Sequence, residues 1–326
     1  MSAGFSASAR QTGSRLMSVL APFIGLAVVM AIFYAIPPHR SVSLLDVRTI
    51  AVHTVIVGTC AMGMTLIIIS GGIDLSVGSA IALCSVMAAL TLAQGHPVAA
   101  AVAVAIGTGA LCGLYNGLLV TGLRLPPFIA TLGTLGFFRG VAKWISNSQP
   151  VNAPTHGLEL WVQPVPNADW LVFAPAVWVT LGLAVLMAVV LRYSLLGRYA
   201  FAIGSNEATA RLCGIRVPRV KVFIYITAGL LVGLAGLLQF ARLTQGDPTV
   251  AVGLELDVIA AVVIGGGSLA GGQGSIVGTL TGAFLMAYLR NRCTALLWPN
   301  YIQEIIVGHI IIIAVAIDQW RMRRAT

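Results

Sequence analysis

Residues 69–79 read ISGGIDLSVGS, a short polar stretch between long apolar runs. Gly71 and Gly72 break a helix that arrives from the preceding run, and Asp74 follows two residues later. The Asp74 carboxylate can accept the amide hydrogen of Ser76 or of the residue after it, and so cap the next helix. Inside a bilayer, backbone groups freed by a helix break must find partners or face a cavity. Asp74 is therefore predicted to cap a helix, and the same break can line a polar path.

The composition around this stretch is that of an all-α integral membrane protein. Of the 326 residues, 58% are apolar and 9% are charged, whereas soluble domains carry about 25% charged residues. A mean hydropathy of +0.94 leaves too few polar side chains to cover a soluble core. The net charge of +9 is explained by basic residues in cytoplasmic loops, so no nucleic-acid partner is expected.

Gaps between charged residues predict about ten membrane spans, because one span needs roughly 20 apolar residues. The predicted spans are 18–36, 50–69, 75–93, 98–121, 127–146, one between 169 and 192, one between 221 and 242, 256–267, 274–289 and 302–318. The eighth is short enough to be re-entrant. The expected organisation is a basic tail at 1–17, one transmembrane domain at 18–320 and a basic end at 321–326.

Basic loops predict the orientation of these spans. Residues 192–221 carry six Lys and Arg side chains and the chain closes with RMRR at 321–324, so both segments are expected in the cytoplasm. Residues 147–171 carry no Lys or Arg and are expected outside. Ten spans with both termini in the cytoplasm satisfy these placements. Against the charge rule, they leave five arginines outside: Arg40, Arg48, Arg242, Arg290 and Arg292.

Ten spans also allow an inverted repeat, because spans 2–5 and 7–10 would run in opposite senses. IDLSVGSAIAL at 73–83 and LDVIAAVVIGG at 256–266 support it. Each segment places an aspartate, Asp74 or Asp257, just before an apolar run of small residues. Asp257 is therefore grouped with Asp74 as a candidate for a helix break or a translocation path.

The sequence contains no pattern that predicts catalysis. It has no GxxxxGK[ST] phosphate loop and no nucleophile with a base, and its histidines and cysteines lack metal-ligand spacing. The chain is thus expected to be no enzyme and to hold no metal or cofactor, and any ATP that drives it is bound by another chain. The alternative is an ion-coupled secondary transporter of a small polar solute, which would need mid-membrane carboxylates.

Three stretches, taken together, resemble the permease subunits of bacterial sugar-uptake ABC transporters. They are ISGGIDLSVGS (69–79), AIGSNEATARLCGI (202–215) and LELDVIAAVVIGGGSLAGGQGSIVGTLTGA (254–283). The branch is the ribose/xylose/galactoside type, which includes autoinducer-2 permeases, and the similarity runs in order from about residue 45 to the C-terminus.

This resemblance implies a vitamin-B12-permease-like fold in the bacterial inner membrane. Two permease copies, identical or paralogous, would surround a central path. ATPase subunits in the cytoplasm and a periplasmic sugar-binding protein would be the partners. The implied function is import of a neutral monosaccharide or similar polyol by alternating access, with the soluble partner selecting the sugar.

The resemblance makes 202–215 the loop that docks on the ATPase. Its candidate contact residues are Asn206, Glu207, Arg211, Gly214 and Ile215. The fuller importer signature, Glu-Ala-Ala with Gly four residues after the last Ala, is off by one here, because 207–209 read EAT before Gly214. Ser205 or Asn206 can cap a short helix, and Glu207 suits its first turn. The alternative is a solvated loop held inside by its charge.

Three of the outward arginines are candidates for docking the binding protein. They are Arg242, Arg290 and Arg292. Arginine forms bidentate pairs with carboxylates, which suits recognition of an acidic partner surface. The alternative partner is membrane lipid, whose phosphate groups lie at the same level.

Overall fold

The computed structural model describes residues 22–36, 42–167 and 170–325, without the side chains of residue 317 and of 321–325. The predicted basic tail at 1–17, Arg40 and the side chains of the basic end lie outside the described residues. Within them, a helix coincides with each of the ten predicted spans. These helices are Pro22–Ala35, α2 (Leu44–Ile69), α3 (Val77–Ala93), α4 (Val98–Gly122), α5 (Pro127–Ile145), α6 (Pro175–Tyr193), α9 (Val217–Leu243), α10 (Leu254–Ile264), α11 (Ile276–Ala295) and α12 (Asn300–Ala325).

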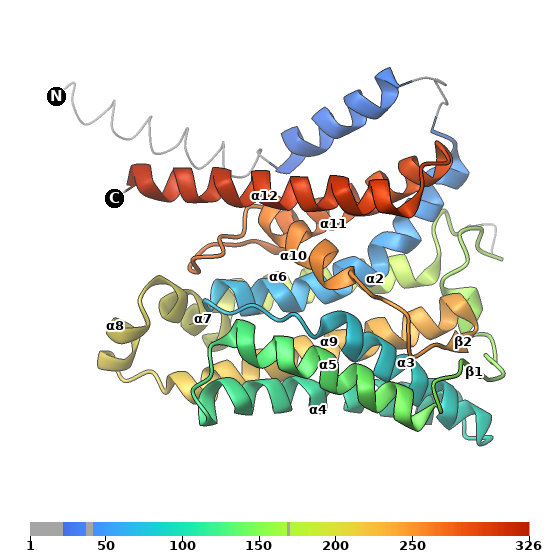
Figure 1. Ribbon diagram of the computed structural model, residues 1–326, viewed down its shortest axis with the longest axis horizontal. Helices are drawn as coiled ribbons and strands as arrows, with labels where there is room; N and C mark the ends of the chain where they lie inside the picture. Colours follow the sequence, from blue (N-terminus) through green and yellow to red (C-terminus); the bar gives the residue numbers. More distant parts are fainter. Residues whose placement is uncertain (1–21, 37–41, 168–169, 326) are drawn as a thin grey trace.

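Smaller elements mark the two ends of the helix assembly. At one end, α7 (Leu195–Ser205) and α8 (Glu207–Leu212) lie on the same side as the C-terminal end of α12 (Figure 1). At the opposite end, β1 (Val151–Asn152) pairs antiparallel with β2 (Gln245–Gly246), and the 3₁₀ helix η1 (Leu158–Trp161) follows β1 (Figure 1). The segment expected in the cytoplasm and the segment expected outside therefore lie at opposite ends of the fold.

Long apolar helices differ in how deeply they are buried. Five helices of the described chain are long and apolar enough to cross a membrane: α2, α4, α6, α9 and α12 up to Trp320. In their most apolar windows, α2 is 89% buried and α9 56%, whereas α4 and α6 are 28% and α12 is 12% buried. Because α2, α4, α6 and α9 have nearly equal hydropathy, their different burial comes from their position in the helix packing. The two most buried helices, α2 and α9, form the centre of the fold.

The short helix α10 does not cross a membrane by its own length. It has 11 residues and so rises about 16 Å, against a hydrocarbon core of about 30 Å. The chain continues through 265–275 to the start of α11, where the Gly272 amide donates to the Ile69 carbonyl at the end of α2 over 2.9 Å. The eighth predicted span is therefore a half-crossing helix followed by irregular backbone.

Helix contacts agree with the predicted inverted repeat. α2 packs on α10 and α11, as α9 packs on α3 and α4. Likewise α3 contacts α4 and α5, as α10 contacts α11 and α12. If α2, α3, α4 and α5 are replaced in order by α9, α10, α11 and α12, and the reverse, each of these helix contacts becomes another observed contact. The central helices α2 and α9 run in opposite directions, because α2 ends beside α7 and α9 begins just after α8.

Glycines bring α4 and α9 into backbone contact. A Cβ atom added at Gly109 would clash with the carbonyl oxygen of Gly229, and one added at Gly113 would clash with that of Tyr225. Helices in lipid gain little from apolar burial alone, so close backbone approach through small residues supplies the packing energy. This crossing joins the first repeat to the second.

We expect Gly113→Ala to lower the free energy of unfolding by about 1–3 kcal/mol, because the added methyl group forces the two backbones apart. Gly107→Ala on the same helix is the matched control, since nothing lies within 4 Å of a Cβ at that position. Thermal unfolding of both purified variants measures the difference. Equal midpoints for the two variants would contradict the tight crossing.

Candidate functional site

The helix break at 69–76 is held by the Asp74 side chain, which is 7% exposed. Its Oδ1 atom accepts hydrogen bonds from the Ser76 amide at 2.8 Å and the Ser76 hydroxyl at 2.6 Å. Its Oδ2 atom accepts from Asn116 Nδ2 of α4 at 3.2 Å, and the same amide donates to Ser76 Oγ at 2.8 Å. Ser76 is the residue just before α3. Asp74 thus satisfies the start of α3 and ties it to α4.

The structure explains why both residues 71 and 72 of the break are glycine. Gly71 has φ of +77°, a left-handed conformation that a side chain strains. Its amide donates to the Ile68 carbonyl at 2.9 Å, which ends α2. A Cβ atom added at Gly72 would lie 3.1 Å from the Tyr225 hydroxyl. The second glycine therefore lets the α9 tyrosine reach the break.

Two polar atoms of this cluster have unused hydrogen-bonding capacity. The Tyr225 hydroxyl and Asn116 Oδ1 are buried, and neither has a hydrogen-bond partner among the described residues. A buried polar atom left unpaired costs about 1–3 kcal/mol. We call Asp74, Ser76, Asn116 and Tyr225 the first-repeat cluster, after the helix break that it surrounds.

A second carboxylate, Asp257, lies in the first turn of α10 and is 3% exposed. Its Oδ2 and Oδ1 atoms accept hydrogen bonds from Nε and Nη2 of Arg290 on α11, at 2.6 and 2.9 Å. This bidentate pair ties the start of α10 to α11, and the role of Asp257 at a helix break or in a translocation path stays a prediction. The pair also gives Arg290 an internal partner, although 36% of the Arg290 side chain stays exposed.

The carbonyl groups of the irregular backbone before α10 find their hydrogen-bond donors in a side chain of another helix. Arg139 of α5 donates from one nitrogen, Nη1, to the carbonyl oxygens of Pro248 and Val250 at 2.9 and 2.6 Å. A guanidinium carries five N–H donors, which makes it suited to freed carbonyl groups. Sequence analysis did not select Arg139, and an arginine about two turns from the end of a predicted span is the signal that could have found it.

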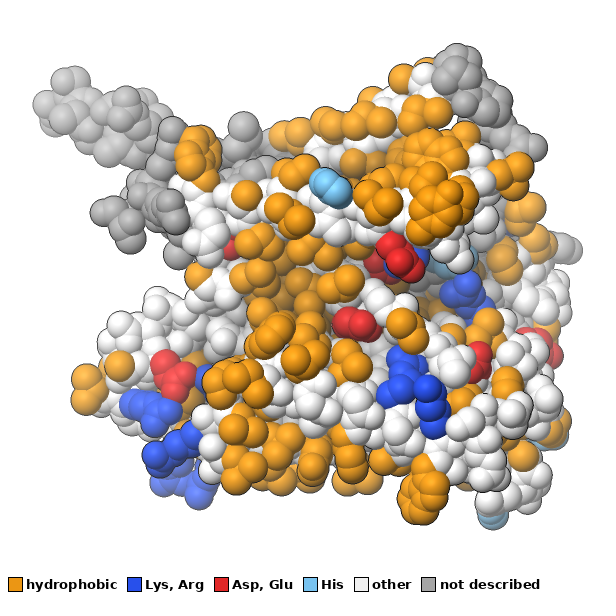
Figure 2. Space-filling model, viewed as in Figure 1, with side chains coloured by type: hydrophobic (Ala, Val, Ile, Leu, Met, Phe, Trp, Pro, Cys, Tyr) orange, Lys and Arg blue, Asp and Glu red, His pale blue; other side chains and the backbone are white. Residues whose placement is uncertain are grey.

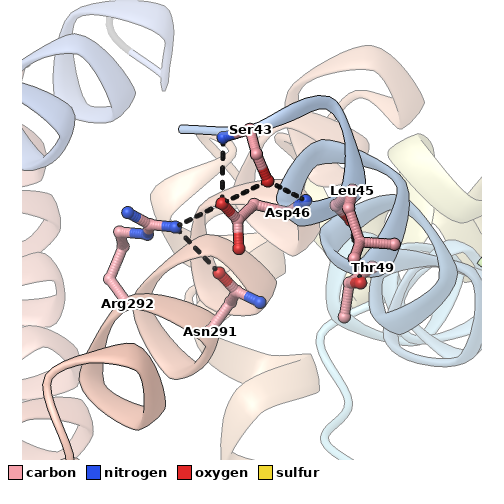
Figure 3. Close-up of polar contacts among 6 residues, drawn as sticks. All are labelled: Ser43, Leu45, Asp46, Thr49, Asn291 and Arg292. Atoms are coloured by element: carbon pink, nitrogen blue, oxygen red, sulfur yellow. Dashed lines mark hydrogen bonds and ion pairs between the residues drawn. The ribbon is translucent and has the colours of Figure 1, made fainter. Parts of the chain in front are cut away.

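Arg292 differs from its expected place on the outer surface. Its side chain is 8% exposed, and its Nη2 atom lies 3.4 Å from Asp46 Oδ2 at the start of α2 and 3.4 Å from Asn291 Oδ1 (Figure 3). Asp46 also closes the capping box of α2 with Ser43. Arg292 thus packs α11 against α2.

These contacts explain why several arginines lie on the side where the charge rule disfavours them. Arg290 and Arg292 are neutralised by carboxylates, and Arg48 Nε donates to the Val172 carbonyl at 2.7 Å. Arg242, in the last turn of α9, has no hydrogen-bonded or ionic partner within the described part of the chain. Among the described arginines of this group, Arg48 and Arg242 therefore keep charges that no carboxylate neutralises, and Arg242 also lacks a hydrogen bond.

Arg242 and Asp257 line one cavity of about 540 Å³ at the β1–β2 end of the fold. Figure 2 shows acidic and basic side chains gathered in a hollow beneath α12, on a face that is otherwise largely apolar. The cavity is lined by residues of α2, α9, α10, α11 and the start of α12, and by Ala251 and Val252 before α10. Its other polar lining residues are Thr49, His53, Arg290, Asn291, Thr294 and Gln303.

The loop at 202–215 is ordered by its own side chains. Asn206 Oδ1 accepts from the Thr209 amide at 2.9 Å, so Asn206, one of the two caps that the sequence allowed, caps α8 with Glu207 in its first turn. Glu207 bonds to Arg211 at 2.5 Å and to Lys221 at 2.7 Å. The hydrogen bonds from Lys221 and then Arg211 lower the pKa of Glu207. These pairs should therefore persist as the pH falls and break only below the ordinary glutamate range.

The end of α8 is closed by its own backbone, whereas the end of α7 packs on two other segments. Gly214 has φ of +83°, and the amide of Ile215 donates to the Ala210 carbonyl at 3.1 Å, which closes α8. Gly204 of α7 packs directly on the carbonyl of Ile69 and the amide of Gly272. The loop is thus in backbone contact with the end of α2 and with the connection between α10 and α11.

Comparison with known families identifies the kind of protein. Residues 47–315 match the family described as branched-chain amino acid transport system / permease component. The chain belongs to this family of ABC permeases. It is accordingly a multi-pass inner-membrane protein and a transport subunit, and the ATPase of such a transporter is a separate subunit that works with a binding protein.

The similarity between this permease and its relatives extends over most of both chains. It is 40% identical to the ribose import permease protein RbsC of Escherichia coli (strain K12), over 90% of this chain and 92% of the relative. It is 37% identical to the fructose import permease protein FrcC of Rhizobium meliloti, over 92% and 84%. It is 32% identical to the L-arabinose ABC transporter permease protein AraH of Azospirillum brasilense, over 86% and 82%. No solved structure matches the permease.

We expect Asp74→Asn to be mild and Asp74→Leu to lower the free energy of unfolding of the permease by about 1–3 kcal/mol. Asparagine keeps an acceptor for Ser76, and Asn116 can turn its unpaired Oδ1 towards the new amide. Leucine leaves the Ser76 and Asn116 donors buried without acceptors.

Asp247→Leu is the matched control, because Asp247 forms the same turn with Thr249 at an exposed position, where water replaces the lost bonds. Unfolding and sugar uptake are measured for all three variants. An Asp74→Asn permease that folds like wild type yet transports poorly would show that the charge acts on the substrate, contrary to the capping role.

Proposed function

We propose that the permease imports a neutral monosaccharide or similar polyol from the periplasm to the cytoplasm by alternating access. The observation that carries this proposal is the chemistry of the cavity lined by Arg242 and Asp257, which we call the outer cavity. Its buried carboxylate is already paired with Arg290, so it offers hydrogen-bonding atoms with little net attraction for a cation. The family description mentions amino acids, but a zwitterion would need an unpaired carboxylate for its ammonium group. The sugar permeases among the relatives support the neutral substrate.

The loop at 202–215 is proposed to receive the ATPase subunit. Its contact residues would be Asn206, Glu207, Arg211, Gly214 and Ile215. Two facts support this role: the loop projects at the end of the fold that carries the C-terminal part of α12 (Figure 1), and Arg211 keeps 60% of its side chain exposed. We place this end, with both chain termini, in the cytoplasm, and the β1–β2 end in the periplasm.

Other partners are proposed from the same arrangement. A second permease copy, identical or paralogous, would complete the path along the hollowed face of α10, and membrane lipid would cover α4, α6 and α12, which are mostly exposed. Arg242 is the best-placed docking residue for the sugar-binding protein, since its charge is free. Docking through Arg290 and Arg292 stays a prediction. Reversing their charges would also break the pairs with Asp257 and Asp46, so it cannot test docking alone.

Uptake into proteoliposomes tests the transport proposal. We expect the reconstituted permease, with its ATPase and binding protein, to accumulate D-ribose, D-fructose or L-arabinose only when ATP is supplied on the ATPase side. ADP is the control. Uptake driven by an ion gradient without ATP would instead establish the secondary transporter.

For the coupling loop, we expect Glu207→Lys to leave the permease inserted but to lose most ATP-driven uptake while the ATPase still turns over. The lysine repels Arg211 and Lys221, which Glu207 holds in place. Glu207→Gln retains hydrogen bonding without charge and should be intermediate. Normal uptake by the Glu207→Lys transporter would rule out the docking role.

A further inference from the structure

The inverted repeat relates the outer cavity to the buried Asp74 cluster. Asp74 pairs with Asn116 of α4, and Asp257 pairs with Arg290 of α11. Asn116 and Arg290 each lie about one and a half turns before the end of their helix. Both pairs therefore join the same two helices of their respective repeats. They lie towards opposite ends of the fold because the repeats run in opposite senses.

The central helix of the other repeat contributes to each site. Tyr225 lies in the third turn of α9 and reaches the Asp74 cluster, and His53 lies in the third turn of α2 and lines the outer cavity. The two sites thus have the same plan: a carboxylate, a side chain that binds it, and a ring from the opposite repeat.

In this conformation, the two sites differ in access. Asp74 is 7% exposed, and Asn116 and Tyr225 are each 1% exposed, so the first-repeat cluster is shut. The second-repeat site opens into a cavity of about 540 Å³, within the range of small-molecule sites. One site is open while its counterpart is closed, as alternating access requires.

Polar side chains in the open cavity are left for a ligand. Gln303 of α12 is 4% exposed, lines the cavity and forms no hydrogen bond with any described residue. His53 likewise has no hydrogen-bond partner in the described chain. Arg290 keeps N–H donors beyond the two that Asp257 takes, and each Asp257 oxygen keeps a lone pair. An amide, a ring nitrogen, a neutralised ion pair and the unpaired Arg242 guanidinium form a donor and acceptor set that matches the hydroxyls of a polyol.

We propose that this cavity is a sugar-receiving site within each permease copy, in which Gln303, His53 and the Asp257–Arg290 pair bind sugar hydroxyls. The proposal rests on the proposed sugar transport and specifies where the sugar lies after release from the binding protein. No Phe, Tyr or Trp side chain lines the cavity within the described residues, so the broad stacking surface that tightens sugar binding is missing. Weak binding suits a site that must pass its ligand on.

The test compares permease variants in the complete reconstituted transporter, with D-ribose, D-fructose and L-arabinose as probes. Gln303→Met keeps the shape of the side chain and removes its hydrogen bonds, and His53→Leu removes the ring nitrogens. Thr294→Trp obstructs the cavity at an exposed lining position, so it stays informative if a buried variant folds poorly. Gln94→Met, at an exposed position at the end of α3, is the matched control.

We expect Gln303→Met and His53→Leu each to lower uptake at limiting sugar about two- to tenfold, the effect of one hydrogen bond to a neutral group. Thr294→Trp should lower it at least as much, whereas association of the sugar-loaded binding protein and basal ATP hydrolysis should match those of the Gln94→Met control. Uptake equal to the control in all three variants would overturn the site while leaving sugar transport intact. A wild-type transporter that takes up none of the three sugars would overturn the proposed function, and the site with it.

Discussion

A helix that stops inside a membrane must find partners for its freed backbone groups, and this fold depends on how it does so in two places. After α2, the Asp74 carboxylate receives the Ser76 amide and hydroxyl. Before α10, the Arg139 guanidinium donates hydrogen bonds to the Pro248 and Val250 carbonyls. Without such internal partners, irregular backbone could not enter the hydrocarbon region. At the first break, the Asp74 carboxylate that pairs with the backbone lies beside the unpaired polar atoms of Asn116 and Tyr225.

The α2–α3 break and the α10–α11 connection are in direct backbone contact with the loop proposed to meet the ATPase. Gly204 packs on Ile69 and Gly272 without an intervening side chain, and the Gly272 amide bonds to the Ile69 carbonyl. A displacement of α7 would therefore reach the α2–α3 break and the α10–α11 connection together. Backbone contacts are stiff, because packed interiors have few voids to absorb movement. This gives a physical route by which one cytoplasmic event changes both repeats.

Much of the architecture could be predicted from the sequence because charges, glycines and prolines mark the ends of spans. The same reasoning could not predict long-range pairing. Arg290 and Arg292 look alike in the sequence, yet one binds Asp257 on α10 and the other lies beside Asp46 on α2. Such pairs depend on which helices become neighbours, and charge spacing along the chain carries no such information.

Several site residues were missed for a related reason. Asn116 lies within the stretch GTGALCGLYNG at 107–117, which reads as a small-residue packing face, and that role is real for Gly109 and Gly113. An amide in an apolar span was the available signal, since buried polar groups in membranes need partners. Gln303 and Tyr225 are equally inconspicuous. Their importance appears only when α9 and α12 are placed beside the breaks.

The central claim is that the inverted repeats direct one carboxylate site towards each side of the membrane. It requires α8 and β1 to lie on opposite sides. Cys213, at the end of α8, is exposed, and the other four cysteines are buried; Asn152→Cys adds a thiol on β1, where the side chain is exposed. In sealed vesicles whose periplasmic face is outward, a membrane-impermeant maleimide should label residue 152 at once and Cys213 only after permeabilisation. Labelling of Cys213 in the sealed vesicles, or of both sites from the same side, would contradict the account.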